Sequence, residues 1–289
     1  MSIIKSTIKT AITKIYQYKA TTQLSQLRNT KTLQTGKIAT AIHDAIRNEL
    51  DPVERQWVDR IEEKRRALNN STEKISKTDF GAGNPDLTQT EDEMYEGVTR
   101  DTTVGKTCRK ASKPYFWSLL LFKLIREFRP SICIELGTCL GISGAYQASA
   151  QKINKNGNLI TLEGAKSLAA LAEKNLQQLG LDNAEVVCGR FQDTLDRVLT
   201  ENKPIDYAFI DGHHDEKATI LYFEQFLPCL SKNSMIIFDD ISWSDGMRNA
   251  WETIKNHKAV KISVDLGVIG ICVLDDNIDK KYSFRIPMF

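Results

Sequence analysis

The sequence lacks several features that would place it in a class immediately. None of its apolar runs approaches the roughly 20 residues that a membrane-spanning helix needs. The N-terminus has no uninterrupted apolar core followed by small cleavage-site residues, which argues against a secretory signal peptide. The net charge is only +2 over 289 residues, so no global electrostatic field attracts nucleic acid. We therefore expect a globular protein that neither crosses a membrane nor binds nucleic acid.

Paired cysteines are also missing. The six cysteines are scattered, and no two of them form a Cys-x-x-Cys pair. Cys133, Cys188 and Cys272 fall inside apolar runs, where a thiol acts as a small buried hydrophobic group. This usage is typical of a reducing compartment, and it predicts a cytoplasmic protein.

The beginning of the chain is locally basic, because Asp44 is the only acid before residue 48. Within it, Ile4, Ile8, Ile12 and Ile15 recur at helical spacing with lysines between them. Three explanations compete: a basic amphipathic helix on an anionic membrane, a transit peptide, or a helix that packs its isoleucine stripe on a neighbouring helix or subunit. We favour packing, which is compatible with a homodimer, and keep peripheral membrane contact as an alternative.

Helix signals continue after the basic segment. Asp51 can cap a helix, Pro52 suits its first position, and Glu54 completes a pair that resembles a capping box. A polar stretch with two glycines and a proline follows and predicts a loop. We expect three parts: a helical extension over residues 1–78, a linker or active-site loop over 79–112, and the main domain over 113–289.

The main domain alternates apolar strands with helices. Such alternation predicts a parallel sheet covered by helices on both faces, an α/β fold of the doubly wound type. Two β-rich runs around Gly267, followed by the YSFRI stretch, predict an antiparallel edge at the C-terminal end of the sheet. The predicted parallel strands are Ile132–Leu136, Leu159–Leu162, Glu185–Cys188, Tyr207–Ile210 and Met235–Phe238.

The first of these strands runs into ELGTCLGIS, at the edge of the sheet where α/β proteins bind their ligands. Gly137, Gly141 and Gly144 do not have the G-x-G-x-x-G spacing of a dinucleotide site. Glu135 stands before the turn, where it would repel a pyrophosphate and attract a cation. These residues favour the cationic S-adenosylmethionine over NAD. Glu163 ends the second strand, where a carboxylate binds ribose hydroxyls in either kind of site.

With ELGTCLGIS, LITLEG and GRFQDTL in this order, residues 113–289 resemble a class I S-adenosylmethionine-dependent methyltransferase. The resemblance is greatest to the metal-dependent catechol and caffeoyl-CoA O-methyltransferases, and it implies a Rossmann-like sheet of seven strands. The pattern is also similar to bacterial methyltransferases of unassigned substrate, whose N-terminal helices resemble residues 38–70. The resemblance implies that the glycine turn holds the methionine moiety, Ser143 its carboxylate, and Phe191 and Gln192 the adenine. The expected cofactor-binding residues are Glu135, Gly137, Gly141, Ser143, Glu163, Phe191, Gln192 and Asp211.

Three acids end the fourth and fifth strands: Asp211, Asp239 and Asp240. If these strands are neighbours, the carboxylates converge into a set of oxygen ligands that suits Mg²⁺, Ca²⁺ or Mn²⁺. The resemblance implies a divalent ion there that orients a substrate hydroxyl. It also places Asp240 where an asparagine is usual, and His214 where the catechol enzymes have a lysine base. A simpler explanation is that the aspartates cap the elements that follow and that His213 and His214 are solvated.

We therefore predict an S-adenosylmethionine-dependent methyltransferase that acts on a hydroxyl of a small molecule. His214 is the predicted general base and Asp211 the second catalytic residue. A divalent ion such as Mg²⁺ is expected to assist the reaction. The alternatives are metal-independent methylation of a nitrogen or carboxylate, and a non-catalytic module that binds a partner through its N-terminal helices. Trp243 either packs in the wall of the site or stacks on a planar acceptor.

Overall fold

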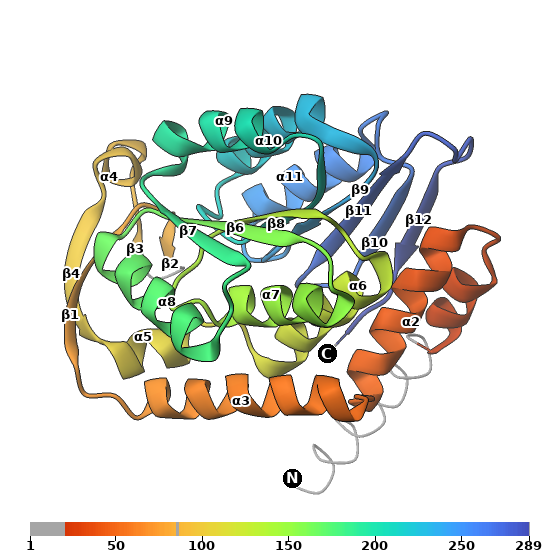
Figure 1. Cartoon of the computed structure of the whole chain (residues 1–289). Helices are drawn as coiled ribbons and strands as arrows, with labels where there is room; N and C mark the ends of the chain where they lie inside the picture. The colour runs from red at the N-terminus through yellow and green to blue at the C-terminus, as the bar shows by residue number, and fades with distance from the viewer. Residues whose placement is uncertain (1–20, 85–86, 289) are drawn as a thin grey trace, which may run out of the picture.

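The computed structural model describes residues 21–84 and 87–288 and contains one large twisted sheet between two layers of helices (Figure 1). Within these residues the sheet has eight strands in the order β12-β10-β11-β9-β8-β5-β6-β7. The strands are β5 (Ile132–Leu136), β6 (Asn158–Glu163), β7 (Ala184–Cys188), β8 (Ile205–Ile210), β9 (Leu230–Phe238), β10 (Ile262–Asp265), β11 (Gly270–Asp275) and β12 (Tyr282–Arg285). The α/β prediction is confirmed, and all five predicted parallel strands are present.

The pairing of the strands puts the ends of β5 and β8 next to each other at the centre of the sheet. Strand β5 pairs in parallel with β6 on one side and with β8 on the other, and β8 pairs in parallel with β9. Antiparallel pairing occurs at the C-terminal end, where β11 runs against both β9 and β10. The expected count of seven strands is wrong by one, because Tyr282–Arg285 adds in parallel to β10.

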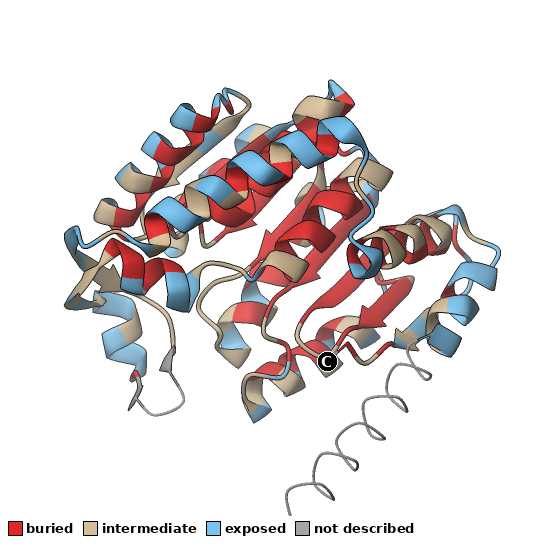
Figure 2. Cartoon of the chain, turned by 90° about the horizontal axis from the view of Figure 1, so that it is seen from below, coloured by how far each residue is buried: buried red, intermediate tan, exposed pale blue. Residues whose placement is uncertain are grey.

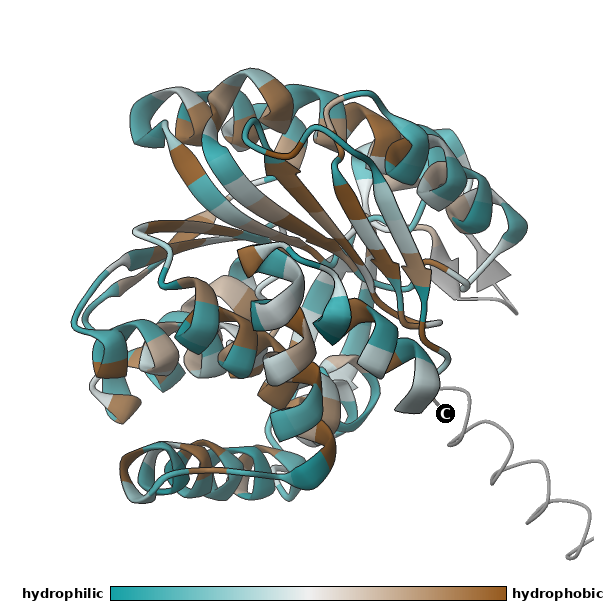
Figure 3. Cartoon of the chain, turned by 90° about the vertical axis from the view of Figure 1, so that its right-hand side faces the viewer, coloured by the Kyte–Doolittle hydropathy of each residue, from teal (hydrophilic) through white to brown (hydrophobic). Residues whose placement is uncertain are grey.

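The helices cover both faces because strand residues alternate between two cores (Figure 3). Cys133 belongs to the core formed with α2, α3, α6, α7 and α8, whereas the next residue, Ile134, belongs to the core formed with α9, α10 and α11. The inner strands of the sheet are largely buried, whereas the edge strands β7 and β12 are only partly buried (Figure 2). The helices are α2 (Leu33–Arg47), α3 (Pro52–Asn69), α6 (Tyr115–Phe128), α7 (Ile142–Asn154), α8 (Lys166–Leu179), α9 (Phe191–Asn202), α10 (Glu216–Phe226) and α11 (Asp245–Asn256).

Helices α2 and α3 confirm the helix signals of the N-terminal part. The Asp51 side chain accepts hydrogen bonds from the backbone N–H groups of Val53 and Glu54, and Glu54 accepts one from Asp51, which completes the capping box. The stripe from Ile4 to Ile15, with its membrane, transit and dimer explanations, lies outside the described residues. No helix in the described part of the chain combines the length and apolar character that a bilayer crossing requires.

The polar stretch predicted as a loop is largely folded, so that prediction is wrong for most of its length. Strand β1 (Lys74–Asp79) pairs antiparallel with β4 (Val98–Thr103), and helices α4 (Glu91–Glu96) and α5 (Val104–Ala111) flank β4. The short strands β2 (Gly83–Asn84) and β3 (Leu87–Thr88) pair with each other. The β1–β4 pair contains few apolar side chains and lies outside the central sheet, and hydrophobic periodicity therefore gave no signal for it. The proposed domain boundaries stay a prediction.

Candidate active site

The site that the sequence predicts lies at the carboxyl ends of β5, β6, β8 and β9, which point to one edge of the sheet. The backbone is strained there. Cys139, His213, His214 and Asp240 have φ angles of 50°, 71°, 52° and 51°, in the left-handed region that side chains other than glycine rarely adopt. Strain of this kind costs about 1–3 kcal/mol per residue and is concentrated at functional sites. Asn48, Arg129 and Lys155 have similar φ angles as the C-caps of helices, whereas these four residues lie together at the ends of the central strands.

The glycine turn after β5 brings two strand ends into contact. Gly137 has a φ of +99°, and a Cβ atom on it would lie 2.0 Å from the backbone oxygen of Asp211. Only glycine allows the turn after β5 to approach the end of β8 this closely. Gly141 begins α7 as its N-cap with no side-chain hydrogen bond, so the first N–H groups of this helix are not capped by a side chain.

Glu135 is placed beneath the start of α7. Its side chain is completely buried and accepts hydrogen bonds from Gln147 Nε2 at 2.7 Å and from Thr161 Oγ1 at 2.6 Å. Burial raises the pKa of Glu135 to about 7, although hydrogen bonds from Ser143, Thr161 and Gln147 and the charge of Lys113 oppose the rise. The carboxylate thus forms part of the floor under the glycine turn.

Glu163 connects the end of β6 to the glycine turn. Its two oxygens accept hydrogen bonds from the backbone N–H groups of Cys139, at 2.8 Å, and Ala165, at 2.9 Å. Burial raises its pKa, and these backbone donors oppose the rise.

A segment far away in the sequence reaches the same place, because a Cβ atom on Gly164 would lie 2.7 Å from the ring of Phe80. The part of the chain expected to border the site therefore does contact it.

The two residues expected beside adenine differ in their surroundings. Phe191 packs edge-on against Tyr222, with ring centroids 5.8 Å apart, and a Cβ atom on Gly212 would lie 2.6 Å from its ring. Phe191 is thus held by the loop that follows β8. Gln192 begins the exposed side of α9.

The carboxylates after β8 and β9 do converge, and a lysine lies between them. Lys113 Nζ is 3.1 Å from Asp211 Oδ2 and makes an ion pair with Asp239. Asp239 is buried, and its Oδ1 has no hydrogen-bond partner among the described residues. Burial and the neighbouring Asp239 raise the pKa of Asp211. For Asp239, burial is outweighed by Lys113 and by a hydrogen bond with Asp211, and its pKa is lowered.

The adjacent histidines face different partners. His214 Nε2 lies 3.8 Å from Asp211 Oδ1 and 3.9 Å from Asp240 Oδ2, and its ring is tilted against that of Trp243. His213 Nδ1 instead lies 2.7 Å from the hydroxyl of Tyr222, and burial lowers the pKa of His213. His214 is thus the histidine that joins the carboxylates.

Comparison with known proteins agrees with this geometry. Residues 134–241 match a family model described as a methyltransferase domain. They form a methyltransferase domain. The chain is 34% identical over 110 residues to a catechol O-methyltransferase of Niastella koreensis, covering 37% of this chain and 48% of that protein. It is 41% identical over 56 residues to a protein-L-isoaspartate O-methyltransferase of Methanococcus aeolicus, covering 19% of this chain and 25% of the relative. The chain thus spans about half or less of the curated relatives that it matches.

Solved structures agree on the fold of the methyltransferase domain. An O-methyltransferase from Bacillus cereus in complex with S-adenosylhomocysteine has a TM-score of 0.50 at 23% identity, covering 58% of this chain and 84% of that one. The O-methyltransferase TomG from Streptomyces achromogenes, in complex with S-adenosylmethionine, has a TM-score of 0.50 at 21% identity, covering 57% and 82%. At these identities the likeness concerns the fold alone. The predicted resemblance to class I methyltransferases of the catechol type is confirmed.

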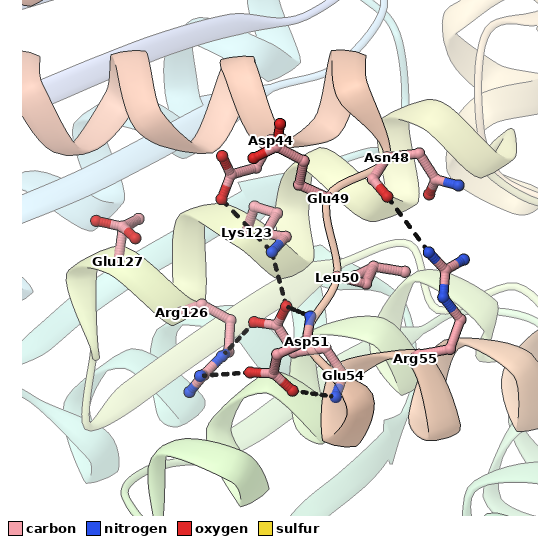
Figure 4. A pocket seen from close by; sticks show the side chains of 10 residues that line it. All are labelled: Asp44, Asn48, Glu49, Leu50, Asp51, Glu54, Arg55, Lys123, Arg126 and Glu127. Atoms are coloured by element: carbon pink, nitrogen blue, oxygen red, sulfur yellow. Dashed lines mark hydrogen bonds and ion pairs between the residues drawn. The ribbon is translucent and has the colours of Figure 1, made fainter.

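The three aspartates of the methyltransferase domain are the right chemical type for a divalent ion, but their arrangement does not fit one. Lys113 occupies the space between Asp211 and Asp239 that such an ion would share. In the described part of the chain, the group of three residues whose potential metal-ligand atoms all lie within 4.8 Å of one another is instead His43, Asp44 and Glu49. Two of these, Asp44 and Glu49, line a pocket formed by residues of α2, α3, α6 and the α2–α3 connection (Figure 4).

Sequence reasoning missed Lys113. The signal was a single lysine directly before the apolar helix α6, in KPYFWSLLLF. A lone lysine at a helix start has no characteristic spacing, and its relation to Asp211 and Asp239 becomes visible only when the chain is folded.

Proposed function

We propose that the protein transfers the sulfonium methyl group of S-adenosylmethionine to a hydroxyl of a small molecule. The observation that carries the proposal is the contact between the glycine turn and the end of β8. Gly137 approaches the backbone of Asp211 so closely that a cofactor held by the turn would have its reactive end beside the aspartates. Positioning of this kind accounts for much of the rate of such a transfer.

In this proposal the cofactor lies across the edge formed by β5, β6 and β8. The uncapped N–H groups at the start of α7, including the backbone N–H of Ser143, bind its methionine carboxylate, and the turn with Gly137 and Gly141 lies against the methionine moiety. Glu163 accepts the ribose hydroxyls with lone pairs that its two backbone hydrogen bonds leave free. Phe191 and Gln192 border the adenine. Glu135 supports the turn from below.

His214 is the proposed general base. The acceptor hydroxyl gives its proton to the imidazole, its oxygen forms a bond to the methyl carbon, and the carbon–sulfur bond breaks to leave neutral S-adenosylhomocysteine. Asp211 and Asp240, at 3.8 and 3.9 Å from the ring, would orient the imidazole and stabilise its protonated form. Trp243, half-buried beside this ring, forms a wall for the acceptor.

The first test is calorimetric titration with S-adenosylhomocysteine, with NAD⁺ as the control ligand. We expect micromolar binding of the first and none of the second. Glu163→Gln should weaken the binding about tenfold or more, because a charged acceptor of hydrogen bonds is worth about 1.5–3 kcal/mol. Glu173→Gln, on the exposed side of α8, is the matched control and should bind normally. Absence of S-adenosylhomocysteine binding would refute the proposal, and binding would justify a screen of hydroxyl acceptors with and without Mg²⁺.

A further inference from the structure

We propose that Lys113 is the resident cation of the carboxylate site and replaces the divalent ion that the family resemblance implies. This inference rests on the proposed function, since it assigns Lys113 a part in the same reaction. The amino group of Lys113 would bind the acceptor oxygen while Asp211 and Asp239 hold it in place. The site would then transfer methyl groups without a metal.

The backbone of Lys113 is fixed from two sides. Its carbonyl oxygen accepts hydrogen bonds from Arg65 Nη1 at 2.7 Å and from Ser118 Oγ at 3.1 Å. These donors come from α3 and from α6, so two helices of the core determine where the lysine side chain begins. A surface lysine that folded over an empty acidic site would need no such anchoring.

The side chain of Lys113 is enclosed as well. It is only 9% exposed, and its Nζ lies 5.9 Å from the centre of the Phe209 ring on β8. Of the three N–H bonds of its amino group, Asp211 and Asp239 take two. The third is available to an acceptor hydroxyl, whose oxygen becomes more nucleophilic as its proton leaves for His214. Lys113 would thus stabilise the developing negative charge, as a metal does in the catechol enzymes.

The ammonium group of Lys113 and a divalent ion cannot bind the site at the same time, because both are positively charged. Both would occupy the gap between Asp211 and Asp239, where water is largely excluded and like charges repel strongly. A divalent ion therefore has to displace Lys113. The carboxylates themselves could hold such an ion, because Asp239 Oδ1 is buried and without a hydrogen-bond partner in the described residues. Removal of the lysine charge should consequently create a metal site.

The experiment measures Mn²⁺ binding through the electron paramagnetic resonance signal of the free ion, in the wild type and in Lys113→Met. We expect at least a tenfold gain in Mn²⁺ affinity in Lys113→Met, and loss of this gain when Asp239→Asn is added. Lys110→Met, at the exposed end of α5, is the matched control and should behave like the wild type. Lys113→Gln, which keeps a polar but uncharged group on a slightly shorter side chain, repeats the test if Lys113→Met does not fold.

Two results would overturn the inference. One is equal Mn²⁺ binding, or none, in the wild type and in the folded Lys113 variant. The other is wild-type binding that Asp239→Asn abolishes. Weak wild-type binding that survives Asp239→Asn belongs to another place, such as His43, Asp44 and Glu49, and agrees with the inference. S-adenosylhomocysteine titrations on the same samples test the proposed function separately, because they do not depend on Mn²⁺.

Discussion

Two lysines, one just before α6 and one within it, pair with carboxylates in very different ways. Lys113 precedes α6 and contacts Asp211 and Asp239, and we call these residues with Asp240 the site cluster. Lys123 lies within α6, with Nζ 2.7 Å from Glu54 and 3.5 Å from Asp44 (Figure 4). Lys123, Glu54, Asp44 and Arg126 form what we call the helix cluster, which joins α2, α3 and α6.

The two clusters differ in how fully the carboxylates are satisfied. In the helix cluster, Lys123 Nζ donates a hydrogen bond to one oxygen of Glu54 and Arg126 Nε donates one to the other, at 2.8 Å. In the site cluster Lys113 pairs with both Asp211 and Asp239, and Asp239 Oδ1 has no hydrogen-bond partner in the described structure. Buried polar groups are nearly always paired in regions that only maintain the fold. The unpaired Asp239 Oδ1 lies beside Lys113 and so supports the proposed ligand site, whereas the fully paired helix cluster is a structural joint.

The largest effect should follow removal of the charge that completes the helix cluster. Lys123→Met leaves Glu54 buried with one cation fewer, and such a change typically lowers the free energy of unfolding by about 3–5 kcal/mol. Urea denaturation measures the loss, and the folded fraction should keep its affinity for S-adenosylhomocysteine. Lys217→Met, which breaks an exposed pair with Glu91, should change neither quantity. A loss no greater than in this control would contradict the structural role of the helix cluster.

Glu135 offers an intermediate case, a buried carboxylate whose closest donors are the neutral groups of Gln147 and Thr161. Burial raises its pKa from the ordinary 4.5 to about 7, so between these values the folded protein keeps a proton that the unfolded chain has released. The contribution of this group to stability is complete below pH 4.5 and is lost as the pH rises to 7. The loss amounts to at most about 3 kcal/mol.

Glu135→Gln should therefore gain stability relative to the wild type as the pH increases from 4.5 to 7.5. Urea denaturation of both proteins across this range gives the difference, in which the titrations of all other groups largely cancel. Glu173→Gln, at an exposed position of α8, should show an offset that does not vary with pH. A constant offset for Glu135→Gln as well would mean that the buried carboxylate titrates normally.

A hundredfold loss of turnover is expected for His214→Ala, because a general base contributes about 10²–10⁴ to the rate. The affinity for S-adenosylhomocysteine should stay the same, since His214 faces Asp211 and Asp240 and is assigned no contact with the cofactor. Initial rates with an acceptor from the screen measure the effect. His43→Ala, in a half-exposed histidine of α2, is the control and should keep wild-type turnover. If His214→Ala also keeps wild-type turnover, the imidazole has no part in the mechanism.

The contrast between His214 and Lys113 shows what could be predicted from the sequence. Strands β5 to β9 were predictable because buried parallel strands are continuous apolar runs, and residues such as Gly137 and His214 follow them directly. Lys113 lies outside this alternation, and only the packing of α6 brings it to Asp239. The pairing of β1 with β4 escaped prediction for a related reason, since it depends on backbone hydrogen bonds between polar strands.

The smallest effect, and the one that best separates the two clusters, should come from removing the negative charge of Asp240. Burial and the charge of Asp239 raise the pKa of Asp240, so its ionised form is disfavoured in the folded protein. Asp240→Asn removes this charge, keeps the size, and suits the φ of 51° at this position, because asparagine tolerates the left-handed region. We expect it to stabilise the fold by about 1 kcal/mol in urea denaturation, a gain typical of relieved strain at functional sites. Asp44→Asn removes a carboxylate 3.5 Å from Lys123 in the helix cluster and should instead destabilise the fold. If both substitutions destabilise it equally, the two clusters do not differ in charge balance, and the case for a ligand at the site cluster would rest on Asp239 Oδ1 alone.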